Sequence, residues 1–172
     1  MNIQAAAARD CVLPRDELAN RLAFERRGKT LVFTNGCFDL VHAGHVRALE
    51  AARQFGDILV VGVNSDSSVR RLKGDSRPIV PEMQRAELVA ALKPVDYVVI
   101  FPEILPIETI RLLRPDVHVK SGDYRAEDMP ETPCVLAAGG RVEITPLLEG
   151  LSSTGIVERI LAGRNGNLRR AG

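Results

Sequence analysis

The stretch LVFTNGCFDLVHAGH, residues 31–45, decides the fold and organises the rest of the chain. It opens with an apolar run containing β-branched and aromatic residues, which predicts a buried strand. The Asn35-Gly36 pair ends this run, and a helical pattern begins at Gly44. A strand that is followed by polar residues and a helix N-terminus is typical of an anion-binding site. We therefore expect phosphate chemistry around the polar side chains between strand and helix, which are Asp39, His42 and His45.

Composition narrows the class of protein and excludes some functions. The 172 residues suit one domain with a sizeable core, and 45% hydrophobic with 26% charged residues is ordinary for a globular chain. An aromatic content of 4% without tryptophan argues against a base-stacking surface. The formal net charge of +1 provides no broad basic field for a nucleic-acid duplex. We therefore expect no nucleic-acid partner, and any anion must be bound by a few local groups.

The cysteines and the apolar runs bear on cellular location. Cys11, Cys37 and Cys134 are widely spaced and form no CxxC pair, which favours a reducing environment over a disulfide framework. The opening residues, MNIQAAAARD, lack the pattern of a signal peptide. No apolar run approaches the ~20 residues that a membrane-spanning helix needs. The expectation is a cytoplasmic protein without a membrane partner.

Strands and helices alternate along the chain. Strands are predicted to begin at 31 and to cover 58–63, 97–101, 117–120, 134–136 and 141–144. Helices are predicted over 14–27, 44–55, 66–72, 81–92 and 107–113, and after 150–154. This alternation predicts an α/β fold with a doubly wound parallel sheet. We divide the chain into an N-terminal helical extension (1–27), one folded domain (28–162) and a tail expected to be disordered (163–172).

The loops that carry polar residues share one position in this predicted fold. Each of them follows a predicted strand or leads into a helix, and they cover 34–45, 64–66, 73–77, 120–124 and 150–154. Ligands of doubly wound sheets bind at the carboxyl ends of the strands. These loops are therefore predicted to form one site.

His42 and His45 lie three residues apart at a helix start, with Gly44 between them to let the backbone approach a ligand. Three interpretations are open. A metal pair would need a third protein ligand, and His118 is the only other histidine. A purely structural role is the second interpretation. We favour the third, in which both imidazoles donate hydrogen bonds to phosphate oxygens as charge develops in a transition state.

The basic residues and the hydroxyls each have a plain and a functional interpretation. Lys73 and Arg77, around Gly74, are either a solvated charged loop or a mobile clamp on a triphosphate. Arg85 either faces the same anion or forms a surface salt bridge with nearby acids. The run Ser152, Ser153 and Thr154 is either an ordinary N-cap or a second cradle for the β- and γ-phosphates.

Three aspartates, Asp39, Asp66 and Asp123, each follow a predicted strand. They are either turn residues or contacts to Mg²⁺, a sugar hydroxyl or a ribose. The sequence has no P-loop, no GxGxxG after a strand and no GxSxG nucleophile elbow. Two anion sites at helix starts, with histidines and a basic loop, favour phosphoryl or nucleotidyl transfer without a covalent intermediate.

Two motifs, TNGCFDLVHAGH (34–45) and GLSSTGI (150–156), resemble those of the HxGH-type nucleotidyltransferases, in the cytidylyltransferase-like branch. The resemblance extends over roughly 28–162 and implies a single Rossmann-like domain. Within this superfamily, the chain most resembles the D-glycero-β-D-manno-heptose 1-phosphate adenylyltransferases. They carry segments similar to NSDSSVRRLKGDSRPI (64–79), QRAELVAAL (84–92), VDYVVIF (95–101) and VKSGDY (119–124).

The resemblance implies a role for each candidate residue. The catalytic groups would be His42 and His45, which stabilise the α-phosphate and its developing charge, and Lys73, which binds the triphosphate or the incoming sugar phosphate. The nucleotide would be bound by Thr34, Asn35, Gly36, Phe38, Gly44, Arg85, Asp123, Ser152, Ser153 and Thr154. The acceptor would be bound by Asp39, Asp66 and Arg77.

The implied reaction transfers AMP from ATP to a sugar 1-phosphate and releases pyrophosphate. Mg²⁺ would be the cofactor, bound mainly through the triphosphate, with Asp39 as the candidate protein ligand. Relatives in this superfamily are commonly dimers, so a homodimer is expected. Two alternatives stay open: a cytidylyltransferase for a polyol phosphate such as glycerol 3-phosphate, and a nucleotide-binding protein without activity.

Overall fold

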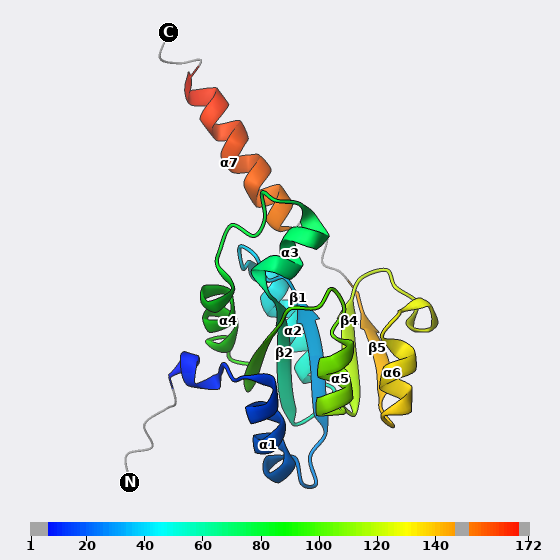
Figure 1. Cartoon of the computed structure of the whole chain (residues 1–172). Helices are drawn as coiled ribbons and strands as arrows, with labels where there is room; N and C mark the ends of the chain where they lie inside the picture. The colour runs from blue at the N-terminus through cyan, green and yellow to red at the C-terminus, as the bar shows by residue number, and fades with distance from the viewer. Residues whose placement is uncertain (1–6, 147–151, 169–172) are drawn as a thin grey trace.

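The computed structural model describes residues 7–146 and 152–168. Within these residues, five parallel strands form one sheet in the order β3-β2-β1-β4-β5, with helices on both faces (Figure 1). The strands are β1 (Leu31–Gly36), β2 (Ile58–Asn64), β3 (Tyr97–Phe101), β4 (Val117–Ser121) and β5 (Arg141–Thr145). The helices are α1 (Arg15–Glu25), α2 (Ala43–Arg53), α3 (Asp66–Lys73), α4 (Glu82–Ala90), α5 (Ile107–Leu113), α6 (Thr132–Ala137) and α7 (Ser153–Leu168), and the short 3₁₀ helices are η1 (Ala8–Cys11) and η2 (Ala126–Asp128). The predicted α/β fold with a doubly wound parallel sheet is confirmed.

Two apolar clusters hold the layers together, one on each face of the sheet. On one face, β-strand side chains such as Val61 pack with Leu49 of α2 and Val89 of α4. On the other face, Phe33 of β1 packs with Leu18 of α1 and Ile110 of α5. Strands covered on both sides need continuous apolar runs. That requirement is met most fully by β2, which is buried along its whole length.

The strand order reverses next to β1, and this reversal places the site. From β1 the chain moves to β2 and β3, and then crosses to β4 and β5 on the other side of β1. The connecting helices lie on opposite faces in the two halves. A crevice therefore forms between the carboxyl ends of β1 and β4, where ligands bind in sheets of this kind.

The strand predicted over 134–136 is wrong, because Thr132–Ala137 forms the helix α6 with a proline in its first turn. The reason is the direction of the neighbouring strands. β4 and β5 run parallel, with His118 paired to Val142. The chain must therefore pass from the carboxyl end of β4 back to the level of its amino end before β5 can begin. A helix spans that distance, whereas the Gly139-Gly140 turn on which the prediction rested would join antiparallel strands.

The ends of other helices also differ from the prediction. Lys73, expected in a loop, is the last residue of α3. The final helix continues to Leu168, past Gly163 where a disordered tail was expected to begin. Each glycine inside a helix costs only about 1 kcal/mol relative to alanine, so neither Gly163 nor Gly166 needs to end α7. The prediction for 169–172 lies outside the described residues.

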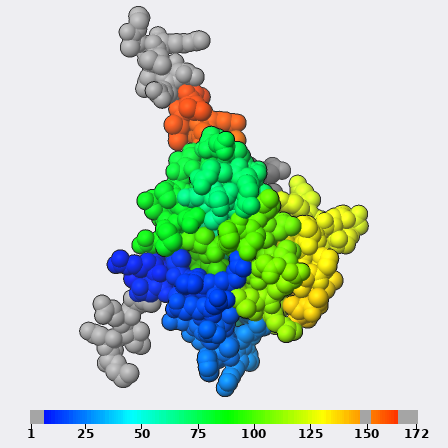
Figure 2. Space-filling view, in the orientation of Figure 1, coloured from blue at the N-terminus to red at the C-terminus, as the bar shows by residue number. Residues whose placement is uncertain are grey.

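The helical N-terminal segment and α7 relate differently to the body of the protein. α1 buries Leu18 and Leu22 against the sheet, and the backbone N–H of Leu13 donates to the Val98 carbonyl at 2.9 Å. Part of 1–27 therefore belongs to the same core. α7 instead projects away from the sheet (Figures 1 and 2). In the described part of the chain, no helix has the length and apolar character to cross a bilayer.

Candidate active site

A cleft of about 750 Å³ lies at the carboxyl ends of the strands, over the reversal between β1 and β4. It gathers side chains from segments at both ends of the sequence, as the loop positions predicted. The predicted site residues that line it are Thr34, Asn35, Gly36, Phe38, His42, Gly44, His45, Lys73, Ser152, Ser153 and Thr154.

His42 and His45 are oriented by the backbone at the start of α2. His42 is the N-cap residue, and its Nδ1 accepts a hydrogen bond from the Gly44 N–H at 3.1 Å. The Nδ1 of His45 accepts from the His42 N–H at 3.3 Å. A neutral imidazole that accepts at Nδ1 carries its proton on Nε2. Each ring therefore keeps one N–H donor for a ligand in the cleft.

The electrostatic surroundings keep these rings neutral. Burial, with smaller contributions from His42 and Lys73, lowers the pKa of His45 to about 4. Burial also lowers the pKa of His42. The two ring centroids are 4.0 Å apart, a distance at which two imidazolium charges would repel strongly. In the free protein the pair thus offers two N–H donors without positive charge.

The loop between β1 and α2 has an uncommon backbone conformation. Phe38 and Leu40 have φ angles of +50° and +53°, which residues with a side chain rarely adopt. The residue between them, Asp39, fixes this loop: its buried carboxylate accepts from the N–H groups of Ile79 and Val80 at 3.0 Å. Strain of this kind collects at functional sites, where the surroundings hold the backbone in place.

The second helix start, at α7, faces the same cleft. The Ser152 hydroxyl accepts from the Gly155 N–H at 3.0 Å, which is an N-cap contact. The Ser153 hydroxyl donates to the backbone carbonyl of Asp39. For the described residues, no protein partner is found for the Thr154 hydroxyl, which lines the cleft. The run therefore combines an N-cap, a tie to the β1–α2 loop and one hydroxyl open to a ligand.

Five predicted residues do not line the cleft, namely Asp39, Asp66, Arg77, Arg85 and Asp123. Asp39 and Arg77 form an ion pair behind the cleft, with Nη1 2.9 Å from Oδ2 but without hydrogen-bond alignment. Arg85 is fully buried, and its guanidinium donates to the carbonyls of Val80 and Cys37 and to Asp66. Asp123 is exposed on the β4–η2 loop. The first four hold together the loops that form the back of the site.

Several cleft residues were not predicted. Lys120, at the end of β4, lies 3.1 Å from the carboxylate of Glu131, which is 2% exposed. Lys120 ends the predicted strand 117–120 and begins the loop 120–124, so the signal that marked other site residues applied here too. Glu131 carried no local signal, because its burial depends on η2 and α6. The other unpredicted residues that line the cleft include Arg47, Asn64, Ile104, Leu105 and Tyr124.

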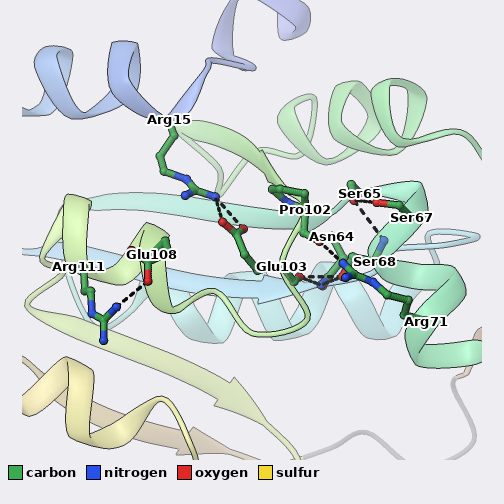
Figure 3. Close-up of polar contacts among 10 residues, drawn as sticks. All are labelled: Arg15, Asn64, Ser65, Ser67, Ser68, Arg71, Pro102, Glu103, Glu108 and Arg111. Carbon is green, nitrogen blue, oxygen red and sulfur yellow. Dashed lines mark hydrogen bonds and ion pairs between the residues drawn. The ribbon is translucent and has the colours of Figure 1, made fainter.

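The wall formed by Ile104 and Leu105 is held by polar contacts at the residue before it (Figure 3). The Glu103 carboxylate accepts from Arg15 of α1 at 2.7 and 2.9 Å, and its carbonyl accepts from the Ser68 hydroxyl at 2.7 Å. Asn64 donates to that same hydroxyl at 2.9 Å. The N-terminal helix therefore helps to place one wall of the cleft.

The donor set does not fit a protein-bound metal ion. Among residues 7–146 and 152–168, no group of three or more His, Cys, Asp or Glu side chains is arranged to hold one. The candidate ligand Asp39 accepts two backbone N–H groups and pairs with Arg77, which leaves its oxygens turned away from the cleft. A divalent cation would therefore need oxygens that a ligand supplies.

Relatives of known sequence match most of the chain. Two proteins named "Bifunctional protein HldE" are similar: that of Syntrophotalea carbinolica is 55% identical over 148 residues, and that of Geobacter sulfurreducens is 51% identical over 147 residues. These matches cover 86% and 85% of this chain but 30% of each relative. The chain thus spans less than one third of the length of the curated relatives it matches.

Two solved structures share the fold of this chain. The lipopolysaccharide core biosynthesis protein of Thermoplasma volcanium superposes with a TM-score of 0.57 at 29% identity, over 70% of this chain and 98% of that one. The pantoate-beta-alanine ligase of Francisella tularensis superposes with a TM-score of 0.56 at 11% identity, over 84% of this chain and 74% of that one, a likeness of fold alone. A family model described as cytidylyltransferase-like matches residues 33–159, and the chain belongs to this family.

Proposed function

We propose that this protein transfers AMP from Mg·ATP to a sugar 1-phosphate, D-glycero-β-D-manno-heptose 1-phosphate, with release of pyrophosphate. The observation that carries the proposal is the position of two helix starts in one cleft. One presents the free N–H donors of His42 and His45, and the other presents the hydroxyl of Thr154. Such an arrangement suits a triphosphate, with the α-phosphate at α2 and the β- and γ-phosphates at α7.

The chemistry follows from these donors. The acceptor's phosphate is largely a dianion near neutral pH, since its second pKa is about 6, so no strong general base is needed. Its oxygen forms a bond to the α-phosphorus while the bond from that phosphorus to the α–β bridging oxygen breaks. Pyrophosphate leaves with the bridging oxygen. The two imidazole N–H groups would stabilise the charge that collects on the α-phosphate oxygens.

Cations in the cleft would supply the rest of the stabilisation. Lys73 enters from the end of α3, close enough to lower the pKa of His45. Lys120 enters from β4, where Glu131 holds its ammonium group. One lysine on each side of β1 allows the triphosphate and the sugar phosphate to be neutralised separately. The cleft is long enough in the sheet direction for both, because it reaches from the ends of β2 to those of β5.

The choice of sugar rests on the sequence resemblance and on the relatives. The matched relatives are called bifunctional, and this chain corresponds to 30% of their length, so we assign it one of two activities. The name of the Thermoplasma volcanium structure, a lipopolysaccharide core biosynthesis protein, agrees with a sugar-nucleotide product. A homodimer in the cytoplasm, where ATP is available, completes the proposal. Light scattering of the purified protein and fractionation of cells test these last two points.

A pyrophosphate-release assay tests the activity. The protein is incubated with Mg²⁺, with ATP or CTP, and with heptose 1-phosphate or glycerol 3-phosphate. We expect pyrophosphate only with ATP and the heptose phosphate. A preference for CTP would contradict adenylyl transfer, and nucleotide binding without pyrophosphate from any pair would contradict an enzyme of this class.

A further inference from the structure

A buried histidine lies directly behind the cleft. His118 of β4 has no exposed surface, and its Nε2 is 3.2 Å from the side-chain oxygen of Asn35. Asn35 lies near the end of β1 and lines the cleft. The strands are neighbours, with Phe33 paired to His118, so the contact joins the two strands between which the strand order reverses.

The direction of this hydrogen bond follows from the chemistry of the two groups. The Asn35 Oδ1 atom can only accept, so His118 must donate its Nε2–H. The Nδ1 atom of His118 is then a bare lone pair, and it is buried without a partner. An unpaired acceptor is tolerated in protein interiors more often than an unpaired N–H. The opposite tautomer would leave a buried N–H unsatisfied and is therefore disfavoured.

The surroundings keep His118 a neutral donor. Burial, with a smaller contribution from Lys120, lowers the pKa of His118 to about 3. Its ring packs against Phe33, with centroids 5.5 Å apart. His118 therefore stays uncharged near neutral pH, and its one N–H remains directed at Asn35.

This contact has a consequence for the cleft. A free asparagine amide can turn its oxygen or its nitrogen toward a ligand with little difference in energy. With its oxygen held by His118, Asn35 keeps the NH₂ group for the other direction. In the described residues, no protein acceptor lies within hydrogen-bond distance of that NH₂ group. The pair thus selects a donor, and not an acceptor, at the end of β1.

We propose that His118 is a positioning residue that fixes the Asn35 amide so that its NH₂ group donates to an oxygen of the bound nucleotide. The proposal rests on the nucleotide-binding role given above to this cleft. The nucleotide is the partner because Asn35 stands at the reversal of strand order, where nucleotides bind in such sheets. It also stands on the strand that leads to His42, whose N–H is assigned to the α-phosphate.

A purely structural role explains the residue less well. The neighbours of His118 along β4 are Val117 and Val119, which are buried. An apolar residue at position 118 would bring no buried, unpaired polar atom of its own, as His118 does with Nδ1. The imidazole is therefore an unfavourable choice for packing alone, whereas it supplies a hydrogen bond that an apolar residue cannot.

The test compares variants that keep or remove the donor. His118→Phe keeps a flat ring without an N–H. His118→Gln places an amide nitrogen near the position of Nε2, and His118→Asn is polar but too short to reach. Binding of ATP and of heptose 1-phosphate is measured separately by calorimetry, with thermal unfolding to confirm that each variant folds. Thr109→Val is the matched control, because it removes another buried, unpaired polar atom from a residue that does not line the cleft.

We expect His118→Phe and His118→Asn to weaken ATP binding about tenfold, the loss that one neutral hydrogen bond produces. His118→Gln should stay within about threefold of the original protein, and Thr109→Val should not change ATP binding. Combined with Asn35→Ala, the change His118→Phe should have no further effect, because it acts through Asn35.

Three outcomes would overturn the proposal. The first is an unchanged ATP affinity in a folded His118→Phe variant. The second is that His118→Phe weakens ATP binding as much in the Asn35→Ala background as in the original protein. The third is that His118→Phe weakens binding of the sugar phosphate but not of ATP. Because binding is measured directly, a protein that binds ATP without releasing pyrophosphate would contradict the proposed function and still decide the role of His118.

Discussion

The hydroxyl of Ser153, the first residue of α7, donates a hydrogen bond to the backbone carbonyl of Asp39. The two residues are 114 positions apart in the sequence. Asp39 lies in the loop before α2, so the bond ties together the two helix starts that face the cleft. A triphosphate bound between them needs a fixed distance from one helix start to the other, and this contact supplies it.

Removing this tie should weaken nucleotide binding. We expect Ser153→Ala to raise the KM for ATP about fivefold, which corresponds to the loss of about 1 kcal/mol from one neutral hydrogen bond. The value of kcat should change less, because the imidazole donors stay in place. Steady-state kinetics with varied ATP measure both constants. Ser67→Ala, an exposed position on α3 outside the cleft, is the control. Equal KM values for the two variants would show that the tie does not serve binding.

The two histidines should matter for the reaction more than for binding. In the proposed mechanism each would donate to an oxygen whose charge grows in the transition state, so His42→Ala or His45→Ala should lower kcat about 10²- to 10³-fold. The dissociation constant of ATP, measured by calorimetry, should rise much less. Unchanged turnover in both variants would remove the imidazoles from the mechanism.

Asp39 should prove to be a stability residue. Its carboxylate is buried, and Asp39→Asn would leave the Arg77 guanidinium, whose side chain is 12% exposed, without its counter-charge. Losing one member of a buried pair typically costs about 3 kcal/mol or more of unfolding free energy. Urea denaturation measures the loss. Asp75 is exposed on the α3–α4 loop, which also carries Arg77. Asp75→Asn should therefore stay within about 0.5 kcal/mol of the original protein in its free energy of unfolding.

A second variant separates charge from geometry at this pair. Adding Arg77→Met to Asp39→Asn removes the stranded charge and should restore part of the lost stability. If the Asp39→Asn and Asp75→Asn variants unfold at the same urea concentration, the buried Asp39–Arg77 pair does not hold the α3–α4 loop in place.

Stability should depend on pH through His118. Its folded pKa is lowered to about 3, so between pH 6.5 and 3 the unfolded chain binds a proton that the folded protein does not. Stability therefore falls as pH decreases through this range, by up to about 1.4 kcal/mol per pH unit from this residue. His118→Phe should flatten the dependence by about that slope, as urea denaturation at several pH values will show. Thr109→Val should keep the full slope, and an unchanged slope in His118→Phe would contradict the assignment.

The fold could be predicted where the signal is local. Continuous apolar runs marked β2 and β3, and the helix α5 begins and ends as predicted, because Arg114-Pro115 stops it. The segment Cys134 to Leu136 shows the limit. Three apolar residues fit a strand and a helix equally, and only the parallel direction of β4 and β5 decides for α6. That constraint is not present in the segment itself.

The site residues also divide into those with a local sequence signal and those that depend on the whole fold. The predicted residues at the end of β1 and at the starts of α2 and α7 line the cleft, whereas Asp39, Asp66 and Asp123, which also follow strands, do not. Arg85 was expected to face a ligand or the surface, but it is fully buried, with every donor group used by the protein. Glu131 and the His118–Asn35 contact depend on elements that meet only in the folded chain.

The most direct test of the account follows the phosphorus atoms of ATP. The protein is incubated with heptose 1-phosphate, Mg²⁺ and ATP that carries a radioactive label in either the α- or the γ-phosphate. Direct attack on the α-phosphorus predicts that the α-label appears in ADP-heptose and the γ-label in pyrophosphate. A γ-label found in the sugar product, or an α-label recovered only as free AMP, would contradict the account.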